Sequence, residues 1–292
     1  MKGLIFINPY LIPKESVISA ERLKKEFADL GVKTDIVAGA DGLFLSDGRI
    51  KNEYECDFAI FLDKDKYVSG ALKKAGVRLF NSHDAIRCCD DKAETYIALS
   101  GSGINIPDTV FGRLCFDKNA ELPDEYLRGI SEKLGFPIVV KESYGSMGKG
   151  VYLAENIGAL KVLAEKLKCK PHLFQRYLGK EKGTDVRVIV IGGKAVAVME
   201  RRNASDFRSN VALGGECKKI DPPESFIKTA EKCAEILSLD YCGVDLLYGD
   251  NDEPFVCEVN SNAFFLGMEK ATGINVAGIY AKYVVEKSGG NA

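Results

Sequence analysis

The spacing of hydrophobic and polar positions changes near residue 90, and the change predicts two kinds of architecture. Before residue 90, short apolar runs alternate with amphipathic stretches. The apolar runs predict strands at residues 4–7, 32–37, 58–62 and 77–80. The amphipathic stretches predict helices at residues 15–30 and 65–75. Strands separated by helices are typical of a parallel α/β sheet. The polar, glycine-rich residues 38–55 predict a loop or a small hairpin.

After residue 90, apolar runs come in pairs that are joined by short turns. The predicted strands lie at residues 136–141, 151–154, 173–177, 185–191 and 194–199, and the predicted helices at 91–100, 123–134, 156–168, 224–238 and 275–286. Strand pairs with short connections favour antiparallel sheets. The second part of the chain is therefore predicted to be α+β, in a new unit that begins near Asp90.

The stretch GVDLLYGDNDEPFVCEVNSN, residues 243–262, predicts a β-hairpin. A four-residue loop at 250–253 is a common connection and fixes one register. That register pairs Tyr248 with Phe255, Leu246 with Cys257 and Val244 with Val259 on an apolar face, and Leu247 with Val256, Asp245 with Glu258 and Gly243 with Asn260 on the other.

Two carboxylates and one amide share the second face of this hairpin: Asp245, Glu258 and Asn260. Like charges directly opposite each other destabilise a sheet, so the pair of acids favours a bound cation. Three oxygen donors without His or Cys suit Mg²⁺. The alternative is a solvated face on which Asp245 and Glu258 pair with nearby Lys or Arg.

A glycine-rich loop, YGSMGKG at residues 144–150, lies between two predicted strands. It lacks the spacing of a P-loop, and its context resembles a flap over nucleotide phosphates. Lys141 ends the preceding strand, from which a lysine can reach a phosphate. The alternatives are a flexible hairpin loop and a solvated lysine. Lys92 follows Asp90 and Asp91 at a predicted helix start, where N-capping explains the acids.

Arginines gather around the strand pair at 185–199. Arg187 alternates with Asp185, and Arg201, Arg202 and Arg208 follow. Together they predict an anion site that could stabilise charge on a transferring phosphate. The alternative is a basic face that is balanced by Glu200 and Asp206.

Composition narrows the function classes. The 292 residues carry a net charge of −2 with acids and bases interspersed, which gives no electrostatic reason to expect nucleic acid or an anionic membrane as a partner. Nine cysteines without a C-x-x-C pair predict reduced thiols in a cytoplasmic protein, in packing or surface positions. The start of the chain has neither a signal-peptide core nor a transmembrane-length run. His83 and His172 leave few candidates for histidine catalysis.

Taken in order, the motifs resemble the ATP-grasp superfamily, and within it the RimK-type carboxylate–amine ligases, which include glutamate ligases. The matching pieces run from about residue 80 to 280: Asp91-Lys92, INIPDT at 104–109, Lys141 with GSMGKGV, Gln175-Arg176-Tyr177, Asp185-Val-Arg187, Arg201-Arg202 with FRSN, GVDLL at 243, EVNSN at 258 and EKATGINVA at 269–277. Each is weak alone, and the ordered set is specific.

The resemblance implies a fold and a set of ligands. A Rossmann-like N-terminal domain at 1–88 would precede an ATP-grasp domain at 89–292, with ATP between subdomains at about 89–173 and 174–292. Lys92 and Lys141 would contact phosphates, the backbone of Arg176 and Tyr177 would contact adenine, and Asp185 would contact ribose. The implied ATP-binding set is Lys92, Lys141, Gly145, Ser146, Met147, Gly148, Gln175, Arg176, Tyr177, Asp185, Arg208 and Asn210.

The implied chemistry is amide formation through an acyl-phosphate, from a small-molecule or peptide carboxylate and an amine. Arg187, Arg208 and Asn210 would be catalytic, and Asp245, Glu258 and Asn260 would hold two Mg²⁺ ions, or Mn²⁺ in their place. Catalysis would rest on positioning and charge neutralisation, so it needs no Ser, Cys or His nucleophile. Assembly into a homo-oligomer is left open.

Three departures from the family pattern limit which properties of the family are carried over to this chain. Glu142 follows Lys141 where the family usually has Pro, and Arg176 stands where an acid is usual. Residues 261–266 read SNAFFL where the glutamate ligases carry SSPG, so neither glutamate nor a ribosomal protein is transferred as substrate. Two alternatives stay open: a nucleotide-binding module or sensor without ligase turnover, and another ATP-grasp chemistry that forms an acyl-phosphate or a thioester.

Overall fold

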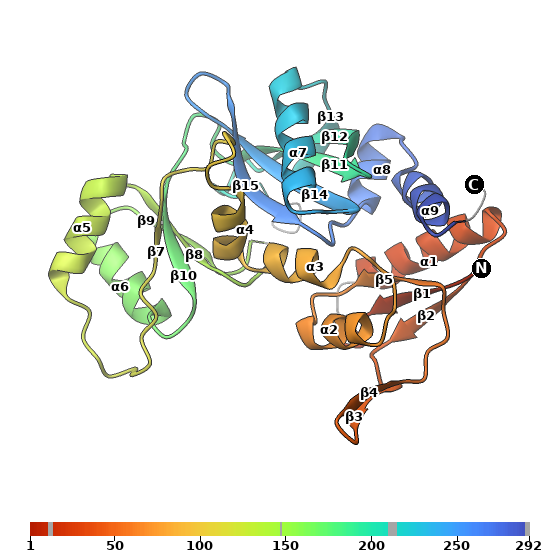
Figure 1. The fold of residues 1–292 in the computed structure, drawn as a ribbon. Helices are drawn as coiled ribbons and strands as arrows, with labels where there is room; N and C mark the ends of the chain where they lie inside the picture. Colours follow the sequence, from red (N-terminus) through yellow and green to blue (C-terminus); the bar gives the residue numbers. More distant parts are fainter. Residues whose placement is uncertain (11–13, 147, 210–214, 290–292) are drawn as a thin grey trace.

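The computed structural model describes residues 1–10, 14–146, 148–209 and 215–289. Three sheets with their helices follow one another across the molecule, and a small hairpin projects from the N-terminal one (Figure 1). Met147 and Asn210 lie outside the described residues, so the roles predicted for them stay predictions. No helix in the described ranges is both long and apolar enough to cross a membrane.

The N-terminal unit is built on a parallel sheet, as its sequence pattern predicts. Its strands lie in the order β2-β1-β5-β6, and β1 is paired in parallel with both β2 and β5. The elements are β1 (Lys2–Ile7), α1 (Lys14–Asp29), β2 (Lys33–Ala38), β3 (Leu43–Ser46), β4 (Arg49–Asn52), β5 (Phe58–Leu62), α2 (Lys66–Lys74), β6 (Leu79–Phe80) and α3 (His83–Asp90). Strands β3 and β4 form the small hairpin that was one of two readings of residues 38–55.

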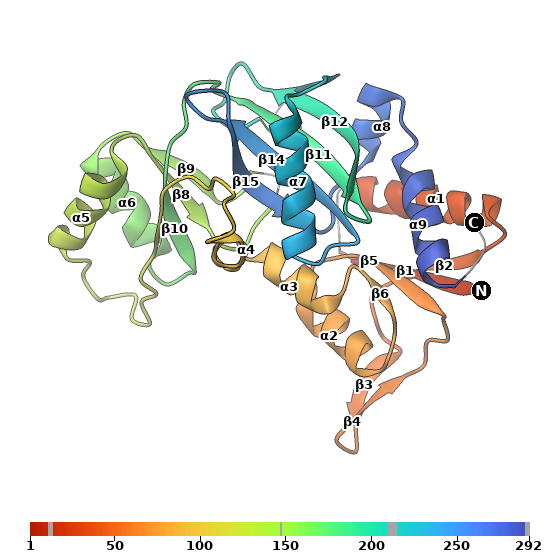
Figure 2. The same cartoon turned by 45° about the horizontal axis from the view of Figure 1, so that its top comes forward.

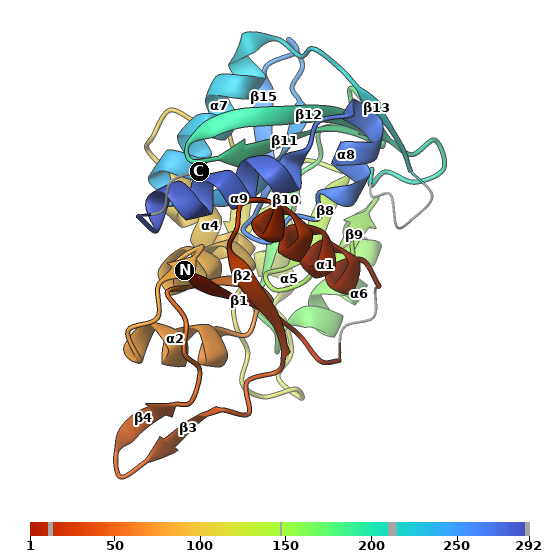
Figure 3. The ribbon, with the colours of Figure 1, turned by 90° about the vertical axis from the view of Figure 1, so that its right-hand side faces the viewer.

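Alternate side chains of this sheet enter different cores, which is what a two-residue strand period requires. Ile5 and Phe58 face α1, whereas Leu4 and Ala59 face α2 and α3. Helix α9 lies beside α1, so the end of the chain helps to cover the first face (Figure 3). The predicted Rossmann-like character and the boundary at residue 88 stay predictions.

The second unit is a small antiparallel sheet in the order β7-β10-β8-β9. Helices α5 and α6 pack on its apolar face around Phe174. Its elements are α4 (Lys92–Leu99), β7 (Thr109–Phe111), α5 (Asp124–Leu134), β8 (Ile138–Glu142), β9 (Val151–Ala154), α6 (Ile157–Leu167) and β10 (His172–Arg176). The short strand β7 was not predicted, because three residues show no readable period.

The third unit is an antiparallel sheet in the order β13-β12-β11-β14-β15. Helix α7 covers one face (Figure 2), and α8 and α9 cover half of the other (Figure 3). Its elements are β11 (Thr184–Ile191), β12 (Lys194–Arg202), β13 (Glu216–Lys219), α7 (Glu224–Ile236), β14 (Tyr241–Tyr248), β15 (Pro254–Asn260), α8 (Leu266–Thr272) and α9 (Val276–Lys287). Strand β13 and helix α8 were missed by the sequence pattern.

Successive side chains of β11 point to opposite faces of the sheet, so one strand contributes both to a hydrophobic core and to a charged surface. Val186, Val188 and Val190 are buried against α7. On the opposite face, Ile189 joins the core beneath α8 and α9, but Asp185 and Arg187 do not. One face of the sheet therefore changes from apolar to charged along its length, and the charged half is free to form a site.

The register predicted for residues 243–262 is right at one end and wrong at the other. Gly243–Asn260, Val244–Val259 and Asp245–Glu258 pair as predicted, but Leu246 pairs with Val256, Leu247 with Phe255 and Tyr248 with Pro254. The register shifts after Asp245, and Cys257 is the extra residue of a β-bulge. The loop has five residues, 249–253, because Gly249 N–H bonds to Glu253 O at 2.8 Å.

Contacts with the loop that follows α4 accompany the bulge. Val256 is fully buried and donates its backbone N–H to Asn105 O at 2.9 Å, and the Asn105 side chain donates to Pro254 O at 3.3 Å. The bulge lets Val256 enter the core while Cys257 and Glu258 both face the charged side of the sheet.

Asn81 holds the N-terminal unit against the third sheet. Its buried side chain donates to Tyr241 O at 2.7 Å and to Ser261 O at 2.8 Å, and it accepts from Asp240 N–H at 2.7 Å. A buried amide that satisfies several backbone groups fixes one arrangement strongly, because any other leaves those groups unpaired. The carboxyl ends of β1 and β5 are thereby positioned next to the charged half of the third sheet.

Candidate active site

A pocket lies between the second and third sheets, with walls from β8, β10, β11, β12, β14 and β15. It is lined by charged, polar and apolar side chains together, as small-molecule sites commonly are. The predicted residues that line it are Lys92, Lys141, Gly145, Ser146, Gly148, Gln175, Arg176, Tyr177, Asp185, Arg208, Asp245 and Glu258. Positions separated by up to 166 residues of sequence therefore meet in one cavity, which agrees with their grouping by motif.

Two buried lysines enter the pocket from the second unit. Lys141, at 5% exposure, lies on β8 with its Nζ 3.4 Å from Tyr96 Oη and 3.8 Å from Cys257 Sγ. Burial lowers the pKa of Lys141, but Cys257, Tyr96 and Glu258 outweigh it, so its net pKa is raised and the amine stays charged. Buried lysines are rare without a partner, so this one argues for an anionic ligand.

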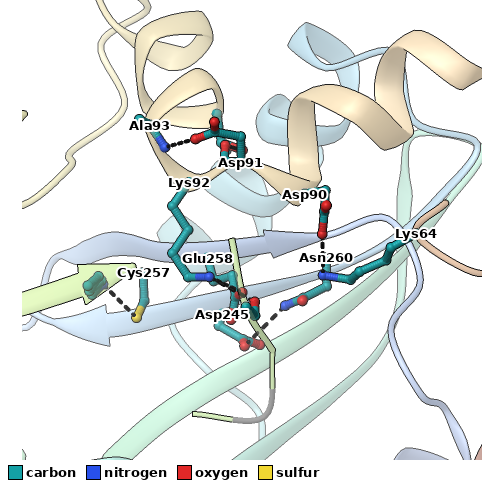
Figure 4. A network of polar contacts seen from close by, with 12 residues as sticks. Lys64, Asp90, Asp91, Lys92, Ala93, Asp245, Cys257, Glu258 and Asn260 are labelled. Atoms are coloured by element: carbon teal, nitrogen blue, oxygen red, sulfur yellow. Dashed lines mark hydrogen bonds and ion pairs between the residues drawn. The ribbon is translucent and has the colours of Figure 1, made fainter. Parts of the chain in front are cut away.

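Lys92 links the glycine-rich loop to the third sheet. Its Nζ donates to Gly145 O at 2.9 Å and lies 3.3 Å from Glu258 Oε1. Asp91 caps α4 by accepting from Ala93 N–H at 2.8 Å, as predicted, and this places Lys92 at the first helical position. Asp90 does not cap a helix start. It ends α3 and pairs with Lys64 (Figure 4).

Charged residues of β11, β12 and β14 form a cross-strand network. Arg187 and Asp245 are directly opposite, as are Asp185 and Arg201. Arg187 Nε lies 2.7 Å from Asp245 Oδ1, and Arg201 Nη2 lies 2.9 Å from Asp245 Oδ2. Arg201 also binds both oxygens of Asp185, and Ser209 Oγ donates to the same carboxylate. Bidentate pairs of this kind are the strongest charged hydrogen bonds in proteins.

The network sets the charge of the acids. Burial raises the pKa of Asp245, but Arg187 and Arg201 outweigh it and hold that pKa below its usual range. Burial likewise raises the pKa of Glu258, but Lys92, Lys64 and Arg187 together outweigh it, so the net pKa is lowered. Both groups are therefore carboxylates at neutral pH. These acids pair with Lys and Arg, as the alternative expected, but Asp245 is buried, so the face is not a solvated one.

The donor set of Asp245, Glu258 and Asn260 still fits a hard cation. All three are oxygen donors on adjacent strands, and Asn260 Nδ2 lies 3.5 Å from Asp245 Oδ2 (Figure 4). Within the described residues no three His, Cys, Asp or Glu side chains form a metal-sized cluster, so the amide of Asn260 would complete the set. A cation bound there would replace Arg187 as the partner of Asp245 and Lys92 as the partner of Glu258.

Arg208 holds the glycine-rich loop against the third unit. Its guanidinium donates to Gly148 O at 2.8 Å, and Asp206 orients it through bonds of 3.0 Å and 2.7 Å. The loop joins two paired strands, β8 and β9, as predicted. If this loop acts as a flap over the pocket, Arg208 on the opposite wall is its partner.

The strand β10 forms the far end of the pocket. Gln175 is buried and donates to Thr109 Oγ1 at 3.0 Å. Arg176 uses its backbone N–H for Asp108 O at 2.9 Å, so that N–H is not free to contact adenine. Asp185 lines the pocket, and its carboxylate accepts hydrogen bonds from Arg201 and Ser209. In this structure it therefore orients Arg201, and a contact with ribose would be an additional role.

Some expectations need correction. The four arginines do not converge, because Arg202 is exposed while Arg201 is buried one position earlier on β12. Arg187 and Asn260 are not among the lining residues and act through Asp245. Cys257 was assigned to packing or surface, yet it lines the pocket as the bulge residue. All nine cysteines, each within the described residues, are free thiols.

The segment 261–266, a candidate for contact with the acceptor, is mostly structural. Ala263 and Phe265 are buried in the core beneath α8 and α9, and Leu266 begins α8. Gly243 leaves room for this segment, since a Cβ there would lie 2.6 Å from Ala263 Cβ. Only Asn262, Phe264 and Leu266 of this segment keep partial exposure.

Comparison with known proteins shows the same pattern in sequence. A profile of the RimK-like ATP-grasp domain matches residues 89–284. The chain is 39% identical over 223 residues to beta-citrylglutamate synthase B of Homo sapiens, covering 76% of this chain and 56% of that protein. It is 36% identical over 225 residues to N-acetylaspartylglutamate synthase A of Homo sapiens, with coverage of 76% and 56%. A probable alpha-L-glutamate ligase of Rhodopirellula baltica is 36% identical over 207 residues, with coverage of 70% and 49%. The chain thus spans about half the length of these relatives.

Solved structures share the fold. A RimK domain protein ATP-grasp from Sphaerobacter thermophilus superposes with a TM-score of 0.73 at 19% identity, over 97% of this chain and 99% of that one. D-alanine–D-alanine ligase from Bacillus anthracis, complexed with ATP, gives 0.73 at 20% identity, over 99% and 97%.

Proposed function

The chain belongs to the RimK-like ATP-grasp family, and from this premise we propose that it is an ATP-dependent carboxylate–amine ligase. The observation that carries the proposal is one pocket in which two buried lysines, Lys92 and Lys141, face the acids Asp245 and Glu258 across the gap between two sheets. A phosphate chain and a cation together would satisfy both sets of charges. The Bacillus anthracis ligase, which shares the fold, is complexed with ATP, and this supports ATP as the nucleotide.

The proposed reaction has two steps. The substrate carboxylate attacks the γ-phosphate of ATP, giving an acyl-phosphate and ADP. The amine then attacks the acyl carbon, a proton leaves the nitrogen, and phosphate departs. Neither step needs a covalent bond to the protein, so the protein contributes position and charge. This accounts for a pocket lined by cations and acids.

Each set of residues has a role in that scheme. Lys141 and Lys92 place positive charge where phosphate oxygens would lie, and Arg208 holds the glycine-rich loop closed through Gly148 O. Asp245, Glu258 and Asn260 would hold Mg²⁺, which would neutralise charge on the phosphates. Arg187, released from Asp245 by that cation, would be available to the developing charge on the transferred group.

We further propose L-glutamate as the amine substrate, on the names of the relatives. Two are synthases of glutamate conjugates and one is a probable alpha-L-glutamate ligase. The carboxylate partner differs among these names, and we take citrate, N-acetylaspartate and short acidic peptides as the first candidates.

The test is phosphate release coupled to amide formation. Purified protein is incubated with ATP, Mg²⁺, L-glutamate and a pool of carboxylates, and products are identified by mass spectrometry. Phosphate release with a new amide is expected, and Glu258→Gln should abolish both. Tight ATP binding without turnover on broad pools of carboxylates and amines would contradict the proposal and indicate a nucleotide-binding module instead.

A further inference from the structure

A groove on the second unit lies outside the pocket described above. It is formed by the strand β7, the residues that follow this strand, and one face of the helix α5. The groove and the pocket between the second and third sheets share none of their described lining residues. The second unit and α1 lie at opposite ends of the molecule in two views (Figure 1 and Figure 2). The groove is therefore a separate site.

The strand β7 turns one edge of its backbone toward this groove. It stands at the end of the sheet order β7-β10-β8-β9, so no strand within the described ranges pairs with its outer side. Gly112 donates its backbone N–H to His172 O at 2.9 Å, on the side of β10. Bonding to one partner alternates along an antiparallel strand, so Phe111 directs its N–H and C=O away from β10. The N–H of Arg113, two residues on, agrees with this direction, because it donates to Tyr126 Oη of α5 at 3.0 Å.

Charged side chains make the groove positive. The Arg113 guanidinium lies over the ring of Tyr126, with Cζ 4.3 Å from the ring centre. Lys133 lines the groove from the last turn of α5. These two cations outnumber the acid Glu125 in the described lining. A net positive groove fits an acidic group better than a basic or a neutral one.

Exposed apolar side chains follow the same edge. Phe111 and Leu114 each keep 46% exposure, and Phe116 keeps 93%. A local concentration of exposed apolar side chains is typical of surfaces that bind other polypeptides. The edge of β7 therefore favours a polypeptide partner over a small polar ion.

Gly129 leaves the helix side of the groove open. A Cβ at this position would meet nothing within 4 Å, so no packing contact in the described structure requires a glycine. Glycine inside a helix is less stable than alanine. The absence of a side chain does allow the backbone of a ligand to approach the helix closely.

We propose that this groove binds an extended acidic peptide, which adds as a strand to β7 and lies between β7 and α5. The main chain of the peptide bonds to the outward N–H and C=O of Phe111, and an acidic side chain pairs with Arg113 or Lys133. A free anion would use the cations and leave the edge of the strand unpaired. A second copy of this chain would bring the same cations to the interface, and like charges repel. The inference goes beyond the proposed ligase reaction and does not depend on it.

Fluorescence anisotropy with the intact chain tests the proposal. The probe is a labelled, end-capped peptide of alternating Val and Glu, about six residues long, which is the usual length of a strand. Wild type should bind it with a Kd below about 1 mM. Replacing Glu by Lys in the peptide should weaken binding about tenfold or more, because the groove is positive. N-methylation of alternate backbone nitrogens should weaken binding about tenfold or more, because it removes main-chain donors.

Variants of the groove locate the peptide. Phe111→Pro removes the outward N–H and leaves the bonds to β10, and proline is accepted on an edge strand whose N–H faces solvent. It should weaken binding about tenfold or more relative to Phe111→Ala, which keeps the N–H. Lys133→Met should also weaken binding, whereas Arg128→Met, which removes an exposed cation of the same helix outside the groove, should not. Gly129→Leu fills the groove with a residue that favours a helix, and keeps the proposal testable if Phe111→Pro does not fold.

Several outcomes would overturn the groove as a peptide site. These are no binding of the acidic probe to wild type, equal affinity for the lysine peptide, equal affinity of Phe111→Pro and Phe111→Ala, and unchanged affinity of Gly129→Leu. Loss of binding in Lys141→Met but not in Gly129→Leu would place the peptide in the other pocket. A dimer at micromolar concentration that Phe111→Pro dissociates would show that a second copy occupies the edge. None of these measurements involves turnover, so failure of the ligase proposal would leave them unchanged.

Discussion

Arg187 places its guanidinium on both oxygens of the Asp245 carboxylate, with Nε 2.7 Å from Oδ1 and Nη2 2.7 Å from Oδ2. The two residues are directly opposite on β11 and β14, so the pair is fixed by the strand register. Asp245 is also one of the residues that we propose to hold a cation. Arginine and cation would therefore compete for one carboxylate.

This competition predicts that Arg187→Gln increases the affinity of the nucleotide-free protein for a divalent ion. Removing the charge leaves Asp245 less compensated, and an increase of about tenfold is expected if the exchange is worth about 1.4 kcal/mol. Mn²⁺ binding followed by electron paramagnetic resonance measures this without turnover. Arg113→Gln, whose guanidinium stacks on Tyr126 at 4.3 Å, is the control. Unchanged or weaker Mn²⁺ binding in Arg187→Gln would contradict the exchange.

Asp245→Asn should be strongly destabilising even without ligands. The substitution leaves Arg187 and Arg201 facing a neutral amide in a buried site, and breaking a buried pair from one side costs about 3–5 kcal/mol. Urea unfolding measures the loss. Glu258→Gln should cost less, because Lys92 keeps its bond to Gly145 O. Asp124→Asn removes the acid of a surface pair with Lys161 and should leave the unfolding midpoint unchanged. Equal midpoints for Asp245→Asn and wild type would show that the network does not stabilise the fold.

Acid should weaken the fold through the same carboxylates. The folded pKa values of Asp245 and Glu258 lie below their ordinary values of 3.8 and 4.5. As pH falls, the unfolded chain takes up protons first, so this stabilisation is complete above those values and is lost as pH falls through the folded pKa. The free energy of unfolding, measured from pH 6 to pH 2, should fall less steeply in Glu258→Gln than in wild type. Parallel curves would rule out a contribution from Glu258.

Arg208→Met should loosen the glycine-rich loop. The variant loses the bond to Gly148 O, and a charged hydrogen bond of this kind contributes about 1.5–3 kcal/mol. KM for ATP should rise at least tenfold, and amide exchange should speed up at Gly148 and Lys149. Arg113→Met leaves the loop untouched and serves as the control. Unchanged amide exchange at Gly148 and Lys149 in Arg208→Met would show that another contact restrains the loop.

Gly243→Ala should destabilise the third sheet. The new methyl would lie 2.6 Å from Ala263 Cβ, and overpacking of this kind typically costs about 1–3 kcal/mol. Gly129→Ala, in α5 with open space around it, should instead stabilise by up to about 1 kcal/mol through helix propensity. Thermal unfolding compares the two. Tolerance of Gly243→Ala would mean that residues 261–266 can shift.

Several features of the site followed from local pattern. The two-residue period of strands put Asp185 and Arg187 on one face and placed Asp245 opposite Glu258. Helix and strand types were readable because periods of 2 and 3.6 residues are properties of the backbone alone. Asp91 was readable as a cap because its side chain meets N–H groups only two and three residues away.

Contacts between distant segments decided the rest. The Asn105 carbonyl accepts the Val256 N–H, and the Val256 side chain is buried in the core. The bulge at Cys257 therefore depends on a residue that lies 151 positions before Val256 in the chain. Arg201 and Arg202 are adjacent in sequence, yet only Arg201 meets Asp245, because β12 presents them to opposite faces. The Lys64 side chain extends toward Asn260 (Figure 4), and Asn81 helps to hold the N-terminal unit in the position that this requires. The sequence by itself determined which side chains share a face, since that depends on backbone geometry. The tertiary structure decided which faces meet, since that depends on how the three sheets pack.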